Sequence, residues 1–322
     1  MALLWNLVLS LSVFLGLIGT WCISMVARNV AKYIHVYVRQ SSIGRYRHQD
    51  GWALVTGATE GIGKALAREL ALRGFNVVVH GRNLRKLETL TSELSKEFSA
   101  LKFRSVVADV TLIGQESKKQ IEQIVNDLED VNLTVLVNNV GGTPSSIVPR
   151  FKPLDQTTFS ENDDTLAMNV GFPTQLTTAL LPSLIKHQPS LIITLGSMAD
   201  YGNPWISIYS GSKAFLLSWC RALAREMKLE GRDIEVLGIL TGEVTDCAHN
   251  KRPATLRMPD AKSYARAVVD KVGCGEMVVN GYWFQGIMKA LVDRLPASVV
   301  TTALINAMRQ QKREYEKAQK SI

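Results

Sequence analysis

Short apolar runs alternate with amphipathic segments over most of this chain, from residue 51 to residue 281. Runs rich in Val, Ile and Leu predict seven strands, at 52–56, 76–80, 103–108, 134–138, 191–195, 235–239 and 277–280. The segments between them have helical periodicity and predict helices at 63–73, 84–98, 115–128, 164–187, 208–229 and 262–272. Near-continuous apolar strands separated by helices are typical of a parallel sheet covered on both faces. We therefore predict one α/β domain with a doubly wound, seven-stranded parallel sheet.

The N-terminal segment is a longer apolar run. Residues 2–27 carry no charge, and Asn6 is their only strongly polar side chain. A helix of about 20 such residues crosses the hydrocarbon core of a bilayer. A cleavable signal peptide would need a basic start and a shorter apolar core, and neither is found here. We predict a single-pass transmembrane anchor over residues 1–27 and a basic juxtamembrane connector over residues 28–50. The positive charge that follows the anchor predicts a cytosolic catalytic domain.

Two shorter apolar segments follow the last predicted strand, at residues 282–295 and 297–308, and Pro296 separates them. Neither is long enough to cross a membrane alone. They could lie on a bilayer surface or cover a lipid-binding pocket, and a helix packed on the core is an equal alternative. We predict a helical C-terminal extension over residues 282–322, whose charged tail is either a solvated helix or a frayed end.

Composition narrows the classes of function. The formal charge is +8, but the basic residues gather after the anchor and near the C-terminus, and no zinc-finger or RNA-binding motif accompanies them. We therefore predict no nucleic-acid partner. The four cysteines are scattered, without metal-ligand spacing, which predicts ordinary thiols in a reducing compartment and no metal site.

A glycine-rich turn follows the first predicted strand and precedes the first predicted helix. Gly57 would allow a tight turn, Gly61 a close approach to a pyrophosphate, and Gly63 close packing of the helix on the strand. The helix N-terminus would present free N–H groups to phosphates. The turn therefore predicts a Rossmann-type dinucleotide site, although the loop by itself leaves open a turn without a ligand. The residues expected to contact the cofactor here are Thr56, Gly57, Thr59, Gly61, Ile62 and Gly63.

The end of the second predicted strand indicates which dinucleotide binds. An Asp or Glu there would bind the ribose 2′-hydroxyl of NAD, but no carboxylate is present and Arg82 follows at once. A guanidinium suits the 2′-phosphate of NADP, so we predict NADP(H). Asp109 and Val110 follow the third strand and are expected beside the adenine. Asn138 ends the fourth strand, at the edge where ligands bind in such sheets.

Tyr209 and Lys213 form the only Tyr-x-x-x-Lys pattern in the chain. On a helix they are one turn apart and share a face. An ammonium near a phenol lowers the phenol pKa, which would make Tyr209 a general acid or base near neutral pH. A core tyrosine with a solvated lysine is the alternative. The position of the pair, after the fifth strand and Ser197, favours catalysis.

In their order along the chain, these motifs resemble the short-chain dehydrogenase/reductase family, over residues 51 to about 280. The resemblance rests on the glycine-rich turn, Asn138-Asn139-Val140-Gly141, Ser197 and Tyr209-x-x-x-Lys213, and Asn169 matches a family asparagine after the fourth strand. Within the family, the chain looks most like the membrane-bound group of 17β-hydroxysteroid dehydrogenases and very-long-chain 3-oxoacyl-CoA reductases. That group reduces lipid ketones with NADPH on the cytosolic side of the endoplasmic reticulum.

The resemblance implies a role for each residue of the site. Tyr209 gives a proton to the carbonyl oxygen, and Ser197 hydrogen-bonds that oxygen. Lys213 lowers the tyrosine pKa and binds the nicotinamide ribose, while Asn169 holds a water that links Lys213 to solvent. Val244 and Thr245, after the sixth strand, are implied to meet the nicotinamide carboxamide.

The chain departs from the family pattern in three places. The interval from Ser197 to Tyr209 is 12 residues where the family usually has 13, which we interpret as a shortened loop. Thr241-Gly242-Glu243 stands where many members have Pro-Gly, and Glu243 has no assigned role. The C-terminus lacks the paired lysines that retain many such proteins in the endoplasmic reticulum.

The leading hypothesis is NADPH-dependent reduction of a very-long-chain 3-oxoacyl-CoA in fatty-acid elongation. A steroid or another lipophilic ketone is the alternative substrate, because substrate contacts would lie in loops that the pattern does not resolve. A non-catalytic membrane-anchored scaffold is a remote third hypothesis. A homodimer, or association with other lipid-synthesis enzymes, is the expected form of assembly.

Overall fold

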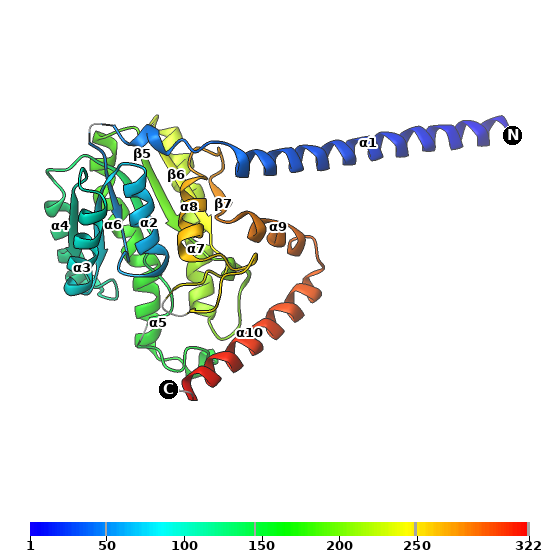
Figure 1. Ribbon diagram of the computed structural model, residues 1–322. Helices are drawn as coiled ribbons and strands as arrows, with labels where there is room; N and C mark the ends of the chain where they lie inside the picture. The colour runs from blue at the N-terminus through cyan, green and yellow to red at the C-terminus, as the bar shows by residue number, and fades with distance from the viewer. Residues whose placement is uncertain (49, 145, 248–249, 321–322) are drawn as a thin grey trace. The chain divides into compact units, whose positions relative to one another are not determined.

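The computed structural model describes residues 1–48, 50–144, 146–247 and 250–320 (Figure 1). The chain divides into two compact units, Met1–Gln40 and Ser41–Ile322.

The first unit is a single helix, α1 (Ala2–Val38). At 1.5 Å per residue its 37 residues extend about 56 Å, more than the roughly 30 Å of a bilayer core. Among the described residues, its segment Leu4–Val38 is the one stretch long and apolar enough to cross a membrane. Its hydroxyls bond back to the helix, as Thr20 does to the Gly16 carbonyl at 2.9 Å. The helix does not end with the apolar run at residue 27, and it includes the first part of the predicted connector.

The second unit begins with residues that pack on the α/β domain. The Ser42 N–H donates to the Val272 carbonyl at 3.0 Å. The short 3₁₀ helix η1 (Ile43–Tyr46) buries Tyr46, whose hydroxyl donates to Glu235 at 2.6 Å. The end of the predicted connector is therefore part of the folded domain, because Tyr46 supplies both apolar area and a satisfied hydroxyl.

The sheet has seven parallel strands in the order β3-β2-β1-β4-β5-β6-β7, as the alternating pattern predicts. Strand order reverses between β1 and β4, which creates the crevice where ligands bind in such sheets. The strands are β1 (Trp52–Val55), β2 (Asn76–Gly81), β3 (Phe103–Val107), β4 (Leu133–Asn138), β5 (Ser190–Leu195), β6 (Ile234–Leu240) and β7 (Val278–Asn280).

Helices cover both faces of this sheet. Helix α2 packs on α8 and α3, whereas α4 packs on α6 and α7 packs on β6 and the turn η3. The apolar side of α4, α6 and α7 meets Leu54, Leu136 and Ile192 of the strands in one buried cluster. The helices are α2 (Gly61–Leu72), α3 (Leu84–Glu97), α4 (Gly114–Asp127), α5 (Phe159–Leu166), α6 (Phe172–Lys186), α7 (Ser207–Leu229) and α8 (Ala261–Val269).

The helix predicted at 164–187 is longer and irregular. It begins at Phe159, where Thr158 and Glu161 form a reciprocal capping box. Between α5 and α6 the backbone widens into a π-helical turn, η3 (Ala167–Gly171), which contains Asn169. Such turns are rare and re-aim the side chains they carry. A π-helical turn holds one more residue than an α-helical turn, and this change is too small to alter the apolar periodicity. The sequence therefore predicts a single regular helix.

The C-terminal extension forms α9 (Trp283–Val292) and α10 (Ala297–Lys320). Helix α10 contacts the loops of the α/β domain (Figure 1): the Lys312 ammonium lies 4.7 Å from the Trp205 ring centroid, and the Tyr315 and Phe151 rings meet edge-on at 5.6 Å. Met308 is buried. The described part of the tail is thus a helix anchored by these contacts.

Candidate active site

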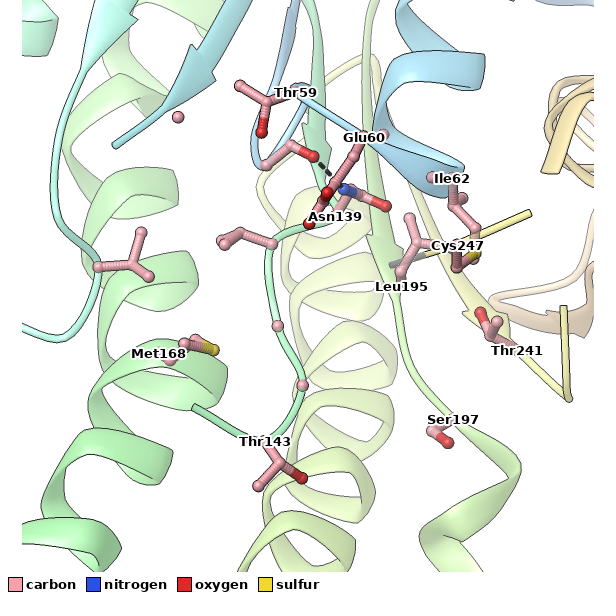
Figure 2. Close-up of a pocket in the computed structure, with 18 of the residues that line it drawn as sticks. Thr59, Glu60, Ile62, Asn139, Thr143, Met168, Leu195, Ser197, Thr241 and Cys247 are labelled. Carbon is pink, nitrogen blue, oxygen red and sulfur yellow. Dashed lines mark hydrogen bonds between the residues drawn. The ribbon is translucent and has the colours of Figure 1, made fainter. Parts of the chain in front are cut away.

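A cleft of about 580 Å³ lies at the carboxyl ends of the strands. Its walls come from the turn after β1, the ends of β2 and β5, the loop after β4 and the start of α7. In Figure 2, Thr59 and Glu60 lie at one end, and Ser197 and Thr143 lie at the other. The cleft is therefore long enough to separate a phosphate-binding end from a reacting end.

The glycine-rich turn forms the first end of the cleft. Gly57 and Gly61 have positive φ angles of 63° and 55°, which favour glycine. A Cβ on Gly63 would lie 2.1 Å from the Gly57 carbonyl oxygen, so α2 approaches the turn as closely as only glycine permits. Thr59 and Ile62 line the same end. The turn and the N-terminus of α2 fit the phosphates of a dinucleotide.

Thr56 and Asn138, which we expect to contact the cofactor, are not among the residues that line the cleft. The Thr56 hydroxyl is buried and accepts the N–H groups of Asn139 and Val140 at 2.9 and 3.0 Å. Asn138 is buried and donates to the Thr177 hydroxyl at 2.9 Å. Instead, Asn139 faces the cleft (Figure 2), and its Nδ2 donates to the Thr56 carbonyl at 2.8 Å. Thr56 and Asn138 therefore lie beneath the cleft wall, and their hydrogen bonds hold the backbone that forms it.

Arg82, Asp109 and Val110 line the cleft, at the ends of β2 and β3. Arg82 is exposed, and Asp109 accepts the Thr111 N–H and hydroxyl at 3.0 and 2.8 Å. His80 also lines the cleft, and no motif in the sequence marks it as a site residue. Its Nδ1 accepts the Gly57 N–H at 3.3 Å, and its ring stacks on Phe172. Burial lowers the pKa of His80 to about 4, which keeps the imidazole neutral.

Ser197, Tyr209 and Lys213 meet at the other end of the cleft. Ser197 follows β5 and caps the short helix η4 (Met198–Tyr201), accepting the Ala199 N–H at 3.1 Å. Lys213 is buried on α7, 5.8 Å from the Tyr209 ring centroid. The 12-residue interval thus still brings Ser197 to the tyrosine.

The pKa of Tyr209 moves opposite to the expected direction. Burial raises it above its usual value, and a hydrogen bond with Ser197 and the charge of Arg150 oppose this rise. Burial also lowers the pKa of Lys213 to about 8. From the sequence, only the charge of Lys213 could be taken into account. Desolvation, which depends on burial in the folded chain, has the largest effect on the pKa of both groups.

Asn169 lies behind the cleft. Its Oδ1 accepts the Gly142 N–H at 2.9 Å, and its Nδ2 donates to the carbonyls of Gly142 and Thr165 at 2.7 and 2.9 Å. A Cβ on Gly141 would lie 2.8 Å from Asn169 Oδ1 and 2.7 Å from Lys213 Nζ, so both side chains pack against Gly141. The implied role of Asn169 in holding a water stays a prediction.

The loop after β6 closes one side of the cleft. Val244 lines it, whereas Thr245 is buried and its N–H donates to the Pro259 carbonyl at 2.9 Å. Glu243 also lines the cleft and pairs with Arg252. Cys247 lies against Gly61 (Figure 2). The departure from Pro-Gly already drew attention to Glu243, whereas no local pattern marks Cys247, because only the path of the loop brings it here.

Comparison with known proteins agrees with this geometry. The profile described as short chain dehydrogenase matches residues 51–255. The very-long-chain 3-oxoacyl-CoA reductase of Scheffersomyces stipitis is 34% identical over 257 residues, 76% of this chain and 71% of that protein. The protein of the same name from Schizosaccharomyces pombe is 34% identical over 242 residues, 72% of this chain and 67% of that protein.

Solved structures share the fold. A 7β-hydroxysteroid dehydrogenase has a TM-score of 0.68 at 20% identity, covering 80% of this chain and 96% of its own. A short-chain dehydrogenase from Sphingobium yanoikuyae in complex with NADPH has a TM-score of 0.61 at 22% identity, covering 77% of this chain and 97% of its own. The chain therefore belongs to the short-chain dehydrogenase family of oxidoreductases.

Proposed function

We propose that this chain reduces a very-long-chain 3-oxoacyl-CoA to the 3-hydroxyacyl-CoA with NADPH, as a step of fatty-acid elongation. The observation that carries the proposal is the meeting of Ser197, Tyr209 and Lys213 at one end of a dinucleotide-sized cleft. The 34% identity to two proteins named very-long-chain 3-oxoacyl-CoA reductase supports this substrate class.

The residues of the cleft fit a nicotinamide dinucleotide. A Cβ on Gly57, Gly61 or Gly63 would press against neighbouring protein atoms, so glycine lets the turn and α2 pack closely with the helix N-terminus free for phosphates. Asp109 and Val110 would hold the adenine end, and the exposed Arg82 would meet a 2′-phosphate. Bound NADPH would supply the hydride for the ketone carbon.

Tyr209 donates the proton that completes the alcohol. Because burial raises its pKa, the phenol is protonated at neutral pH and serves as an acid in the reductive direction. Ser197 is the second donor to the ketone oxygen, where negative charge develops. Lys213, whose ammonium lies 5.8 Å from the Tyr209 ring centroid, is the cation proposed to stabilise the phenolate that remains, and the phenolate then regains a proton from solvent.

Membrane attachment suits such a substrate. Helix α1 would anchor the protein, and we propose the endoplasmic reticulum, with the catalytic domain in the cytosol. Leu291, Leu295 and Val299 of the C-terminal extension are exposed and apolar, which supports contact of this extension with the bilayer surface. A homodimer or a complex with other lipid-synthesis enzymes remains the expected assembly.

The test uses the full-length protein in detergent or nanodiscs with NADPH. We expect oxidation of NADPH with very-long-chain 3-oxoacyl-CoA and far less with steroid ketones. Tyr209→Phe should bind NADPH normally and lose at least about 100-fold in turnover. Tyr201→Phe is the matched control, because the Tyr201 hydroxyl bonds Asp293 and Lys289 away from the cleft. Turnover of steroid ketones alone, or full activity of Tyr209→Phe, would overturn the proposal.

A further inference from the structure

A second, smaller hollow adjoins the reacting end of the cleft. Its volume is about 40 Å³, and it shares Thr143, Arg150 and Tyr209 with the cleft. Thr143 lies at the same end as Ser197 in Figure 2. The remaining wall mixes apolar residues, among them Ile147, Leu154 and Trp205, with an equal number of polar ones. In a substrate whose ketone oxygen binds at Tyr209, the atoms that follow the ketone carbon would therefore lie beside Arg150.

Arg150 is the unusual group in this wall. Its Nε is buried and has no hydrogen-bond partner among the described residues. No ion pair joins its guanidinium to any described carboxylate, and the guanidinium carbon lies 5.6 Å from the centroid of the Phe151 ring. A buried N–H without an acceptor costs about 1–3 kcal/mol, so a site that keeps one is suited to an acceptor supplied by a ligand.

The neighbouring cation Lys152 differs from Arg150 in having an acidic partner. Lys152 also lines the hollow, but its ammonium lies 2.5 and 2.7 Å from the two Glu161 oxygens. Its charge is therefore neutralised within the protein. The charge of Arg150 instead acts on Tyr209, where it opposes the rise in the phenol pKa. Arg150 is thus close to the place where the ketone oxygen would bind.

We propose that Arg150 is a specificity-determining residue that binds the thioester carbonyl oxygen of a 3-oxoacyl substrate. In such a substrate one methylene separates the thioester carbonyl from the ketone, so the two oxygens can reach neighbouring donors. The phosphates of coenzyme A lie many bonds further away and are the wrong distance from Tyr209. This inference rests on the proposed function, and it explains how the site would distinguish a β-keto thioester from a plain ketone.

The test compares two substrates that differ in this carbonyl. One is a long-chain 3-oxoacyl thioester of N-acetylcysteamine, and the other is the matched ketone with a methylene in place of the thioester carbonyl. We expect Arg150→Gln to lower kcat/KM for the thioester at least about tenfold more than kcat/KM for the plain ketone, because the loss of its charge near Tyr209 affects both substrates alike. Arg150→Lys should recover part of the loss, because it restores the charge without the planar fork.

Lys152→Gln is the matched control and should leave the substrate preference unchanged, although it removes an ion pair. Thermal unfolding and NADPH binding of each variant show whether the fold is intact. Equal losses of Arg150→Gln on both substrates would overturn the inference. If the wild type reduces only the thioester, full retention of that rate by Arg150→Gln overturns it as well. If the wild type reduces no 3-oxoacyl thioester, the proposed function itself fails.

Discussion

Lys213 Nζ donates a hydrogen bond of 2.9 Å to the backbone carbonyl of Leu195, at the end of β5. This bond joins α7 to the strand that leads to Ser197, so it fixes the relative position of two groups of the site. It also places a cation in a buried position, where desolvation lowers the Lys213 pKa to about 8. The lysine therefore serves the site at a cost in stability.

Replacing Lys213 by Met should remove that cost. The pKa shift from 10.5 to about 8 corresponds to roughly 3 kcal/mol against the charged form, partly offset by the lost hydrogen bond. We expect a gain of about 1 kcal/mol in unfolding free energy at pH 7 and a loss of at least about 100-fold in kcat/KM. The gain should shrink as pH rises from 8 to 10.5, because only the unfolded wild type stays protonated there. Chemical denaturation across this range measures it, and a variant less stable than wild type at pH 7 contradicts the argument.

Gly63→Ala tests the close approach of α2 to the glycine-rich turn. The added Cβ would lie 2.1 Å from the Gly57 carbonyl oxygen, so the helix must move away from the turn. We expect a loss of about 1–3 kcal/mol in stability and more than about tenfold weaker NADPH binding, measured by fluorescence titration. Gly211→Ala on α7 is the control, since its Cβ would meet nothing within 4 Å and should stabilise the helix by about 0.5–1 kcal/mol. Similar NADPH affinity in Gly63→Ala and wild type would refute the proposal that the glycine-rich turn binds the phosphates of the cofactor.

His80 should make stability depend on pH. Its pKa is about 4 in the folded chain and about 6.5 when unfolded, so the folded state resists protonation. The stability from neutral His80 is present above pH 6.5 and is lost as pH falls toward 4. We expect the free energy of unfolding to decline more steeply over this range in wild type than in His80→Gln. Parallel curves for the two proteins would show that His80 is not the titrating group.

Arg82→Ala should change cofactor preference. The exposed guanidinium lies at the cleft after β2, where it would pair with the 2′-phosphate of NADPH. We expect NADPH affinity to fall by about 10- to 100-fold, with less than about threefold change for NADH. Because the pairing is ionic and exposed, the wild-type preference should also weaken at high salt. Titration of both cofactors at two ionic strengths measures this, and equal losses for NADPH and NADH would exclude the assigned role.

Local patterns were sufficient for the fold and for the main groups of the site. Buried strands alternating with amphipathic helices specify a parallel sheet, because few other arrangements bury both faces of the strands and the apolar faces of the helices. The glycine spacing and the Tyr209–Lys213 spacing are also local, since each depends on one turn or one helix. Boundaries moved by a few residues, and the π-helical turn around Asn169 was missed because it does not alter apolar periodicity.

The sequence by itself determined the doubly wound sheet, the glycine turn and the single face shared by Tyr209 and Lys213. Only the tertiary structure decided that Asn139 and not Asn138 faces the cleft, since that depends on how β4 ends against its neighbours. It also brought Arg150 to the reacting end and set the pKa directions of Tyr209 and Lys213. Those features depend on desolvation and on loops that meet across the sheet edge, and neither is a property of neighbouring residues along the chain.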